Sequence, residues 1–90
     1  MSREGKRLER IFKGVANHRR IDILFLLKKH PNLSLMGISQ SLNCNLKTIA
    51  EHTRRLALAG LIDKSRLDNQ TLHRLSPYGE KILEFVKDLK

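Results

Sequence analysis

The sequence contains few cysteine, proline and aromatic residues. One cysteine, two prolines, three phenylalanines, one tyrosine and no tryptophan occur among its 90 residues. The lone cysteine, Cys44, cannot form a disulfide within the chain, which agrees with a reducing compartment. Because the phenylalanines lie in apolar stripes and the tyrosine begins a helix, no aromatic cluster is left on which single-stranded RNA bases could stack. Single-stranded RNA is therefore a disfavoured ligand.

Long hydrophobic runs are missing as well. The longest, residues 23–27, is far too short to span a bilayer and fits the pattern of an ordinary core helix. The charged residues 1–7 are not followed by the apolar region of a signal peptide. We therefore expect a cytoplasmic protein without a membrane segment.

Patterns typical of metal sites and of catalysis do not stand out. No two of the histidines at positions 18, 30, 52 and 73 have the i, i+3 or i, i+4 spacing that puts two imidazoles on one helix face. No Ser–His–acid arrangement, phosphate-binding glycine loop or carboxylate pair is evident, although catalytic groups can assemble from distant positions. We expect no metal, no cofactor and no enzymatic activity.

What the chain does contain is positive charge. Lysine and arginine total 18 against nine acidic residues, which gives a formal net charge of +9. Mixed-sign surfaces of small domains usually carry a smaller net charge. Such an excess is typical of a protein that binds a polyanion, and nucleic acid is the expected one.

The length predicts a single domain over residues 1–90 with one modest hydrophobic core. No room is left for a separate catalytic domain. Because small cores are often supplemented by oligomerisation, a symmetric dimer is expected before any motif is considered.

Apolar spacing predicts two helices in the first third of the chain. Residues 3–15 carry apolar side chains at helical intervals, with basic residues on the rest of the surface. Asn17 is a suitable N-cap for a second helix, which Pro31 stops near His30.

A helix-turn-helix is predicted next. Ser34 caps a short third helix ending before Asn43, a residue type that tolerates the left-handed backbone of a tight turn. Asn45 caps a fourth helix, which Gly60 closes. Two helices joined by about three residues have the spacing of a helix-turn-helix.

Beyond Gly60 the periodicity changes to that of a small β-hairpin. Residues 61–67 and 71–75 are predicted strands around a polar turn at residues 68–70. Ser76 and Pro77 then begin a last helix that is apolar over much of its circumference.

Several of these segments resemble the ArsR-like family of small winged-helix regulators. Residues 12–24 are similar to the family's opening pattern, and residues 33–42 to its third helix. Residues 45–56 are similar to its recognition helix, including a histidine followed by basic residues, and residues 59–62 (AGLI) to the segment that leads into its wing. Residues 75–79 (LSPYG) also resemble the start of the last helix in PadR-like and MarR-like regulators.

The resemblance implies a mainly α fold with a small β-hairpin, that is, a winged helix-turn-helix of four helices, hairpin and fifth helix. It also implies a transcriptional regulator. Metal-responsive relatives carry a cysteine pair in helix three or an Asp and His cluster in the last helix. Residues 36–39 and 79–89 offer neither, so a metal sensor is not expected.

The predicted recognition helix, about residues 46–59, supplies the first candidates for DNA contact. Lys47 is the candidate for base contact, because the first turn of such a helix lies nearest the base edges. Thr48 and Arg54 could reach bases or phosphates, Arg55 a phosphate, and Leu46 or Ala50 a thymine methyl.

Two residues of this helix have two interpretations each. Glu51 would be repelled by phosphates, so an intrahelical ion pair with Arg54 or Arg55 is favoured over acceptance from cytosine. His52 matches a family position that often contacts DNA, and half-burial against helix three is equally favoured.

Further basic candidates lie in the predicted wing, about residues 62–75, and at the start of helix two. Lys64, Arg66 and Arg74 could contact phosphates or the minor groove, or simply be solvated. Arg19 and Arg20 could approach the backbone beside the free amides of a helix N-terminus, although Arg20 could also be structural.

The terminal helices offer more apolar surface than one small core can cover, which predicts a homodimer. The expected interface residues are Leu8, Ile11, Val15, Ile82, Phe85, Val86 and Leu89. Cys44 is expected to be a small buried hydrophobe, with a redox switch as the minor alternative.

These features together favour a homodimeric, sequence-specific regulator that binds double-stranded DNA. The alternative is a winged-helix module for protein contacts or non-specific nucleic-acid binding. The sequence does not indicate the operator, the regulated genes, the direction of regulation or a small-molecule effector.

Overall fold

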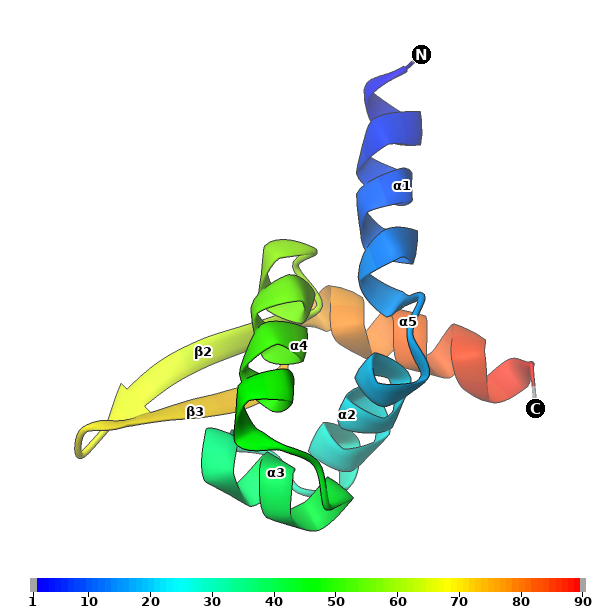
Figure 1. Ribbon diagram of the computed structural model, residues 1–90. Helices are drawn as coiled ribbons and strands as arrows, with labels where there is room; N and C mark the ends of the chain where they lie inside the picture. Colours follow the sequence, from blue (N-terminus) through cyan, green and yellow to red (C-terminus); the bar gives the residue numbers. More distant parts are fainter. Residues whose placement is uncertain (1, 90) are drawn as a thin grey trace.

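The computed structural model describes residues 2–89, and its elements follow the predicted order. The structure consists of five helices and a small sheet, and the first helix and the β-hairpin project from the rest in different directions (Figure 1). The principal extents are 42 × 28 × 21 Å. The winged helix-turn-helix fold class expected from the sequence is confirmed.

The predicted caps define the helix boundaries. Helix α1 spans Arg3–Val15 and α2 spans His18–Lys29, with Asn17 accepting hydrogen bonds from the amides of Arg19 and Arg20. Because this side chain already occupies two amides, the start of α2 has fewer free donors for phosphate than the sequence suggested. Helix α5 spans Pro77–Asp88, and Ser76 caps it.

The helix-turn-helix consists of α3 (Leu35–Leu42) and α4 (Leu46–Leu58). Asn43 adopts the expected left-handed conformation with φ of 52°. In the turn, the Ser39 hydroxyl donates to the carbonyl of Cys44 at 2.5 Å, and the Cys44 amide donates to the carbonyl of Ser39 at 3.0 Å. These bonds hold the turn and leave Cys44 half-buried.

The sheet has three antiparallel strands in the order β1–β3–β2. Strands β2 (Ile62–Leu67) and β3 (Gln70–Leu75) form the hairpin. The predicted three-residue turn is wrong: Gln70 pairs with Leu67, and only two residues, both with positive φ, make the turn. A two-residue turn with this conformation matches the twist of the flanking strands.

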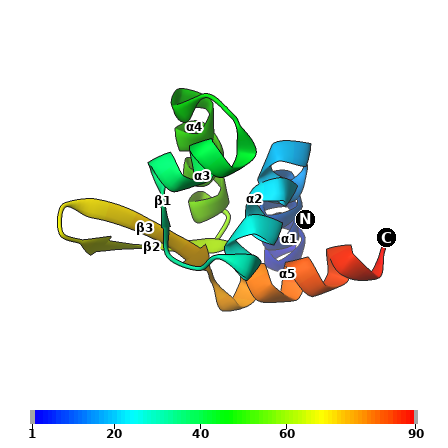
Figure 2. The same ribbon diagram turned by 90° about the horizontal axis from the view of Figure 1, so that it is seen from below.

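The additional strand β1 (Leu33–Ser34) was not predicted, because two residues are too few to produce a periodic pattern. It pairs with the middle of β3 and so ties the hairpin to the start of α3 (Figure 2). The His73 ring at this contact is 2% exposed, and its Nδ1 lies 2.9 Å from the carbonyl of Leu33. Burial is the main reason that the pKa of His73 is lowered.

The core lies where the helices meet the root of the hairpin. Fully buried apolar side chains come from α2, α3, α4, the segment before β2 and α5. The most enclosed are Ile23, Leu24, Ile38, Ile49, Leu56 and Leu61. Because α4 contributes Ile49, Thr53 and Leu56 to the interior, its opposite side must face outward.

Gly79 packs against the backbone between α4 and β2. A Cβ atom at this position would overlap the carbonyl oxygen of Leu61 and lie 3.1 Å from its carbonyl carbon. The obstacle is backbone and cannot rotate away as a side chain could. The last helix can therefore approach this segment only with glycine at this point.

We predict that Gly79→Ala destabilises the protein by about 1–3 kcal/mol or more, because a methyl group would be forced into a packed backbone. In an ordinary helical site the same change stabilises the protein by about 0.5–1 kcal/mol. The sign of the change in the free energy of unfolding therefore shows whether Gly79 is packed against backbone. Thermal or urea unfolding measures it, with exposed Ser41→Ala as the matched control. A Gly79→Ala variant as stable as the control would contradict this packing.

Candidate nucleic-acid interface

The outward face of α4 is polar and basic. Lys47, Thr48, Arg54 and Arg55 are exposed, and Ala50 is partly exposed. The Asn45 side chain accepts hydrogen bonds from the amides of Lys47 and Thr48, at 2.8 and 3.3 Å. This cap begins the helix so that its first turn, at the positive end of the helix dipole, is presented to solvent.

Glu51 is bound by both arginines of this face. Its carboxylate accepts two hydrogen bonds from Arg54, at 2.9 and 2.8 Å, and one from Arg55 at 2.8 Å. The predicted intrahelical ion pair is thus confirmed, with two partners instead of one. These hydrogen bonds lower the pKa of Glu51 to about 2, so it remains a carboxylate throughout the neutral range.

His52 is half-buried, and the charged groups near it include Arg20 of α2. Its Nδ1 is buried and has no hydrogen-bond partner among the residues described. Burial, and next the charge of Arg20, lower the pKa of His52. The neutral form of the ring is therefore favoured in the free protein.

The two arginines at the start of α2 differ in exposure. Arg20 is 9% exposed and donates to the carbonyl of Lys13 at 3.4 Å, which supports its structural interpretation. Arg19 is part-exposed, and its guanidinium lies 3.8 Å from the Asp22 carboxylate. Of this pair, only Arg19 remains accessible to a ligand.

The hairpin register separates the three basic wing residues. Lys64 pairs with His73 and Arg66 with Thr71, so these two cations share one face of the ribbon. Arg74 pairs with Asp63 and belongs to the other face. All three are exposed, but the arrangement does not present them as one cluster.

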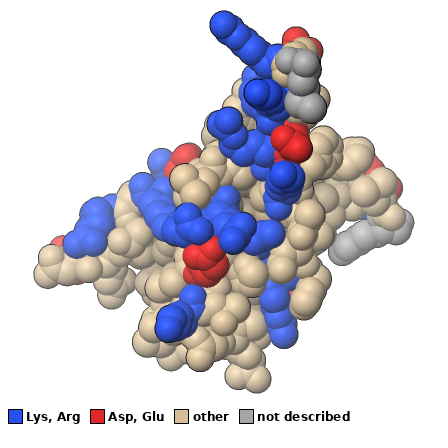
Figure 3. All heavy atoms as spheres, turned by 45° about the horizontal axis from the view of Figure 1, so that its top comes forward, with Lys and Arg blue, Asp and Glu red and all other residues tan. Residues whose placement is uncertain are grey.

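The cations of several elements gather on one side of the molecule (Figure 3). Lys and Arg atoms form an interrupted band from the hairpin, across α4, to the projecting first helix, with few acidic atoms on this face. None of the basic residues of α1 was predicted from the sequence to belong to the interface. Only the packing of α1 against α4 shows that they lie beside it.

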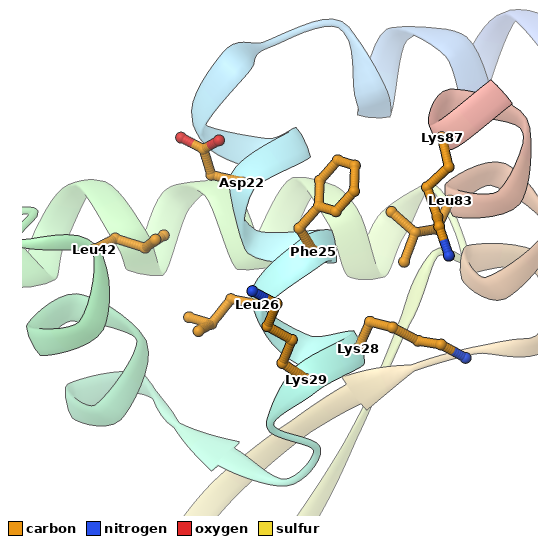
Figure 4. Close-up of a pocket in the computed structure, with 8 residues that line it drawn as sticks. All are labelled: Asp22, Phe25, Leu26, Lys28, Lys29, Leu42, Leu83 and Lys87. Carbon is orange, nitrogen blue, oxygen red and sulfur yellow. The ribbon is translucent and has the colours of Figure 1, made fainter. Parts of the chain in front are cut away.

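A groove between α2, the end of α3 and α5 has a different character (Figure 4). It has a volume of about 780 Å³, and Phe25, Leu26, Leu42 and Leu83 supply its apolar lining. Lysines at positions 28, 29 and 87 and Asp22 lie around it. Lys28 is paired with Glu80 at 2.7 Å.

Residues 2–89 contain neither a cluster of metal-ligating side chains nor a helix suited to cross a membrane. No three His, Cys, Asp or Glu side chains gather there so as to hold a metal ion. None of the helices in this range combines the length and the apolar character needed to cross a membrane.

The MarR family model matches residues 16–70, which is more than half of the chain. The chain belongs to the MarR family. This agrees with the resemblance of residues 75–79 to MarR-like regulators, which stands beside the wider resemblance to the ArsR-like family. No match was found among curated protein sequences.

Solved structures with the same fold cover nearly the whole of this MarR-family chain. HlyU from Vibrio cholerae has a TM-score of 0.85 and 23% identity, covering 99% of this chain and 97% of its own. A second structure is Mb0332 from Mycobacterium bovis, a homodimeric winged helix-turn-helix DNA-binding domain described as a possible ArsR-family regulator. It has a TM-score of 0.87 and 22% identity, and the match covers 99% of this chain and 85% of its own. The transcriptional repressor PagR of Bacillus anthracis has a TM-score of 0.82 and 20% identity, and the match covers 92% of this chain and 95% of its own.

We predict that Glu51→Gln increases affinity for DNA of any sequence. The change removes the one carboxylate of this face and releases Arg54 and Arg55 for phosphates, so the slope of log affinity against log salt should steepen by roughly one contact. Titration of a random duplex at several salt concentrations measures this. Glu84→Gln on α5, which removes a similar surface carboxylate, is the control, and equal slopes for the two variants would contradict the role assigned to Glu51.

Proposed function

We propose that this protein is a homodimeric, sequence-specific regulator of transcription that binds double-stranded DNA. In this proposal α4 lies in the major groove, while β2 and β3 contact the backbone or the minor groove. The observation that carries it is the outward face of α4, where a capped, solvent-facing first turn presents Lys47 and Thr48. Membership of the MarR family and the regulators that share the fold support the same function.

The charges of the outward face favour DNA as the ligand. Arg54 and Arg55 both lie about two helical turns beyond Lys47 on α4, and the wing contributes cations from both faces of its ribbon. Phosphate contacts position a protein on the duplex, whereas contacts to base edges provide specificity. Lys47 and Thr48 are assigned to bases, and Arg54, Arg55, Arg19 and the wing residues Lys64, Arg66 and Arg74 to the backbone or minor groove.

The apolar surface of the terminal helices supports the dimer. Phe12, Phe85 and Leu89 are 53%, 52% and 69% exposed, and they line a shared hollow between the end of α1 and α5. Ile11 and Val15, which were expected at the interface, are each only 9% exposed and belong mainly to the core. The outer part of the interface would thus consist of Leu8, Phe12, Ile82, Phe85, Val86 and Leu89.

We predict that Lys47→Ala and Arg66→Ala weaken DNA binding in different ways. Lys47→Ala should lower affinity for the cognate site by about 1–3 kcal/mol and relax the preference at one base position. Arg66→Ala should weaken binding to cognate and random DNA alike, and reduce the salt slope by roughly one contact. Salt titrations of both variants on cognate and scrambled duplexes measure this difference.

An equal, sequence-independent loss for the two variants would mean that α4 does not read bases. That result would favour non-specific nucleic-acid binding or protein contacts. The cognate site can be obtained beforehand by selection from random duplexes with the unmodified protein.

We predict that Phe85→Asp converts a dimer into a monomer, because it places a charge in an apolar contact. Sedimentation at micromolar concentrations measures the oligomeric state. Glu84→Asp, at the neighbouring position on α5, keeps the charge and is the control. Unmodified protein that is already monomeric at high micromolar concentration would refute the dimer.

A further inference from the structure

Helix α1 has a basic side and an apolar side. Arg3, Arg7, Arg10 and Gly14 follow one another at i, i+4, i+7 and i+11, so they form one stripe along the helix. The apolar residues Leu8, Ile11, Phe12 and Val15 lie on the other side. The side assigned to the dimer is therefore distinct from the side that carries the arginines.

The arginine stripe ends where α1 touches the recognition helix. A Cβ atom at Gly14 would lie 2.5 Å from the Cβ of Ala59 and 3.9 Å from the carbonyl oxygen of Arg55. Since Gly14 shares its stripe with Arg3, Arg7 and Arg10, these arginines extend from α1 on the side that faces α4.

Four cations from the two helices line one shallow cleft at this contact. Arg10 and Lys13 come from α1, and Arg54 and Arg55 from α4, with Leu58 between them. The cleft has a volume of about 160 Å³, and its lining cations belong to α1 and α4, two of the elements over which the basic band runs (Figure 3). It thus joins the outward face of α4 to the arginine stripe.

The positive charge of this region is only partly neutralised. Glu51 pairs with Arg54 and Arg55, and Glu9 lies 3.7 Å from Lys13. Across residues 2–89, no carboxylate lies within 4.0 Å of the guanidinium groups of Arg3, Arg7 or Arg10. All three of these side chains belong to exposed residues, so their charge is available to an external anion.

We propose that the cleft between α1 and α4, together with the arginine stripe of α1, binds backbone phosphates of DNA next to the contact made by α4. This proposal rests on the DNA-binding function proposed above and adds a surface to it. From Arg3 to Arg10 the stripe is about 10 Å long at 1.5 Å per residue. Duplex DNA carries one charge per about 1.7 Å of its axis, so the stripe matches several phosphates.

The test compares two charge-matched double variants. Arg7→Gln with Arg10→Gln removes two cations of the stripe. Lys29→Gln with Lys87→Gln removes two cations from the groove between α2 and α5 (Figure 4), and neither of these lysines lines the α1–α4 cleft. All four residues are exposed, and equal melting temperatures would show that both variants are folded.

Two readouts are needed, on the selected cognate duplex and on a scrambled one. The stripe variant should bind both duplexes several-fold more weakly, with a salt slope lower by roughly two contacts per protomer and an unchanged base preference. Hydroxyl-radical footprinting should show lost protection of sugars adjacent to the half-site. The groove variant should keep the slope and the footprint of the unmodified protein.

Equal slopes for the two double variants would overturn the proposal, and so would a lower slope with an unchanged footprint, which indicates long-range attraction only. Neither outcome affects the proposed function, which depends on the loss of base preference in Lys47→Ala. Loss of protection in the stripe variant alone would support the proposed phosphate contact of α1.

Discussion

The recognition helix, the wing and the last helix meet at one short stretch of backbone, residues 60–61. The Ser76 hydroxyl donates to the carbonyl of Gly60 at 2.6 Å, and the Ser76 amide donates to the carbonyl of Leu61 at 3.1 Å. The same hydroxyl accepts from the amide of Gly79 at 3.0 Å, which caps α5. Ser76 thus satisfies backbone hydrogen-bonding groups at the end of α4 and at the start of α5, and Gly79 lets these two segments of the backbone touch.

This junction determines how α4 and the wing are oriented relative to each other. Because β2 begins directly after Leu61, any shift of that backbone would move the whole hairpin. Strand β1 holds the other edge of β3 through its pairing with His73 and Leu72. The outward face of α4 and the cations of the wing are therefore carried on a frame attached at two places.

Charge on this frame is arranged by the helices that carry it. Helix α1 divides its surface lengthwise, with Arg3, Arg7 and Arg10 in one stripe and the apolar side chains in another, so that in the two proposals one helix serves both a dimer and a DNA contact. In α4, Glu51 holds two arginines in fixed positions at the expense of part of their positive charge. In the proposed function such a carboxylate would limit non-specific attraction to phosphates, and Lys47 is unpaired among the described residues.

Much of the fold could be predicted because its signals are local. Asn17, Ser34, Asn45 and Ser76 each cap a helix as expected, and Asn43 adopts the left-handed turn conformation. Strand β1 could not be predicted in this way, since its two residues are defined by their partner on β3. The two-residue hairpin turn was missed because the polar stretch at 68–70 does not show where pairing resumes.

The sequence by itself determined which segments are helical, where they begin and end, and that the chain carries an excess of positive charge for a polyanion. These properties depend on residue type and on spacing along one element. Only the tertiary structure decided which charges act together. It buried Arg20, placed Arg74 on the other face of the wing from Arg66, and brought Arg10 beside Arg54 and Arg55. The reason is physical: such neighbours lie far apart in sequence or depend on register, and the packing of Gly14 against Ala59 is visible only once the core has formed.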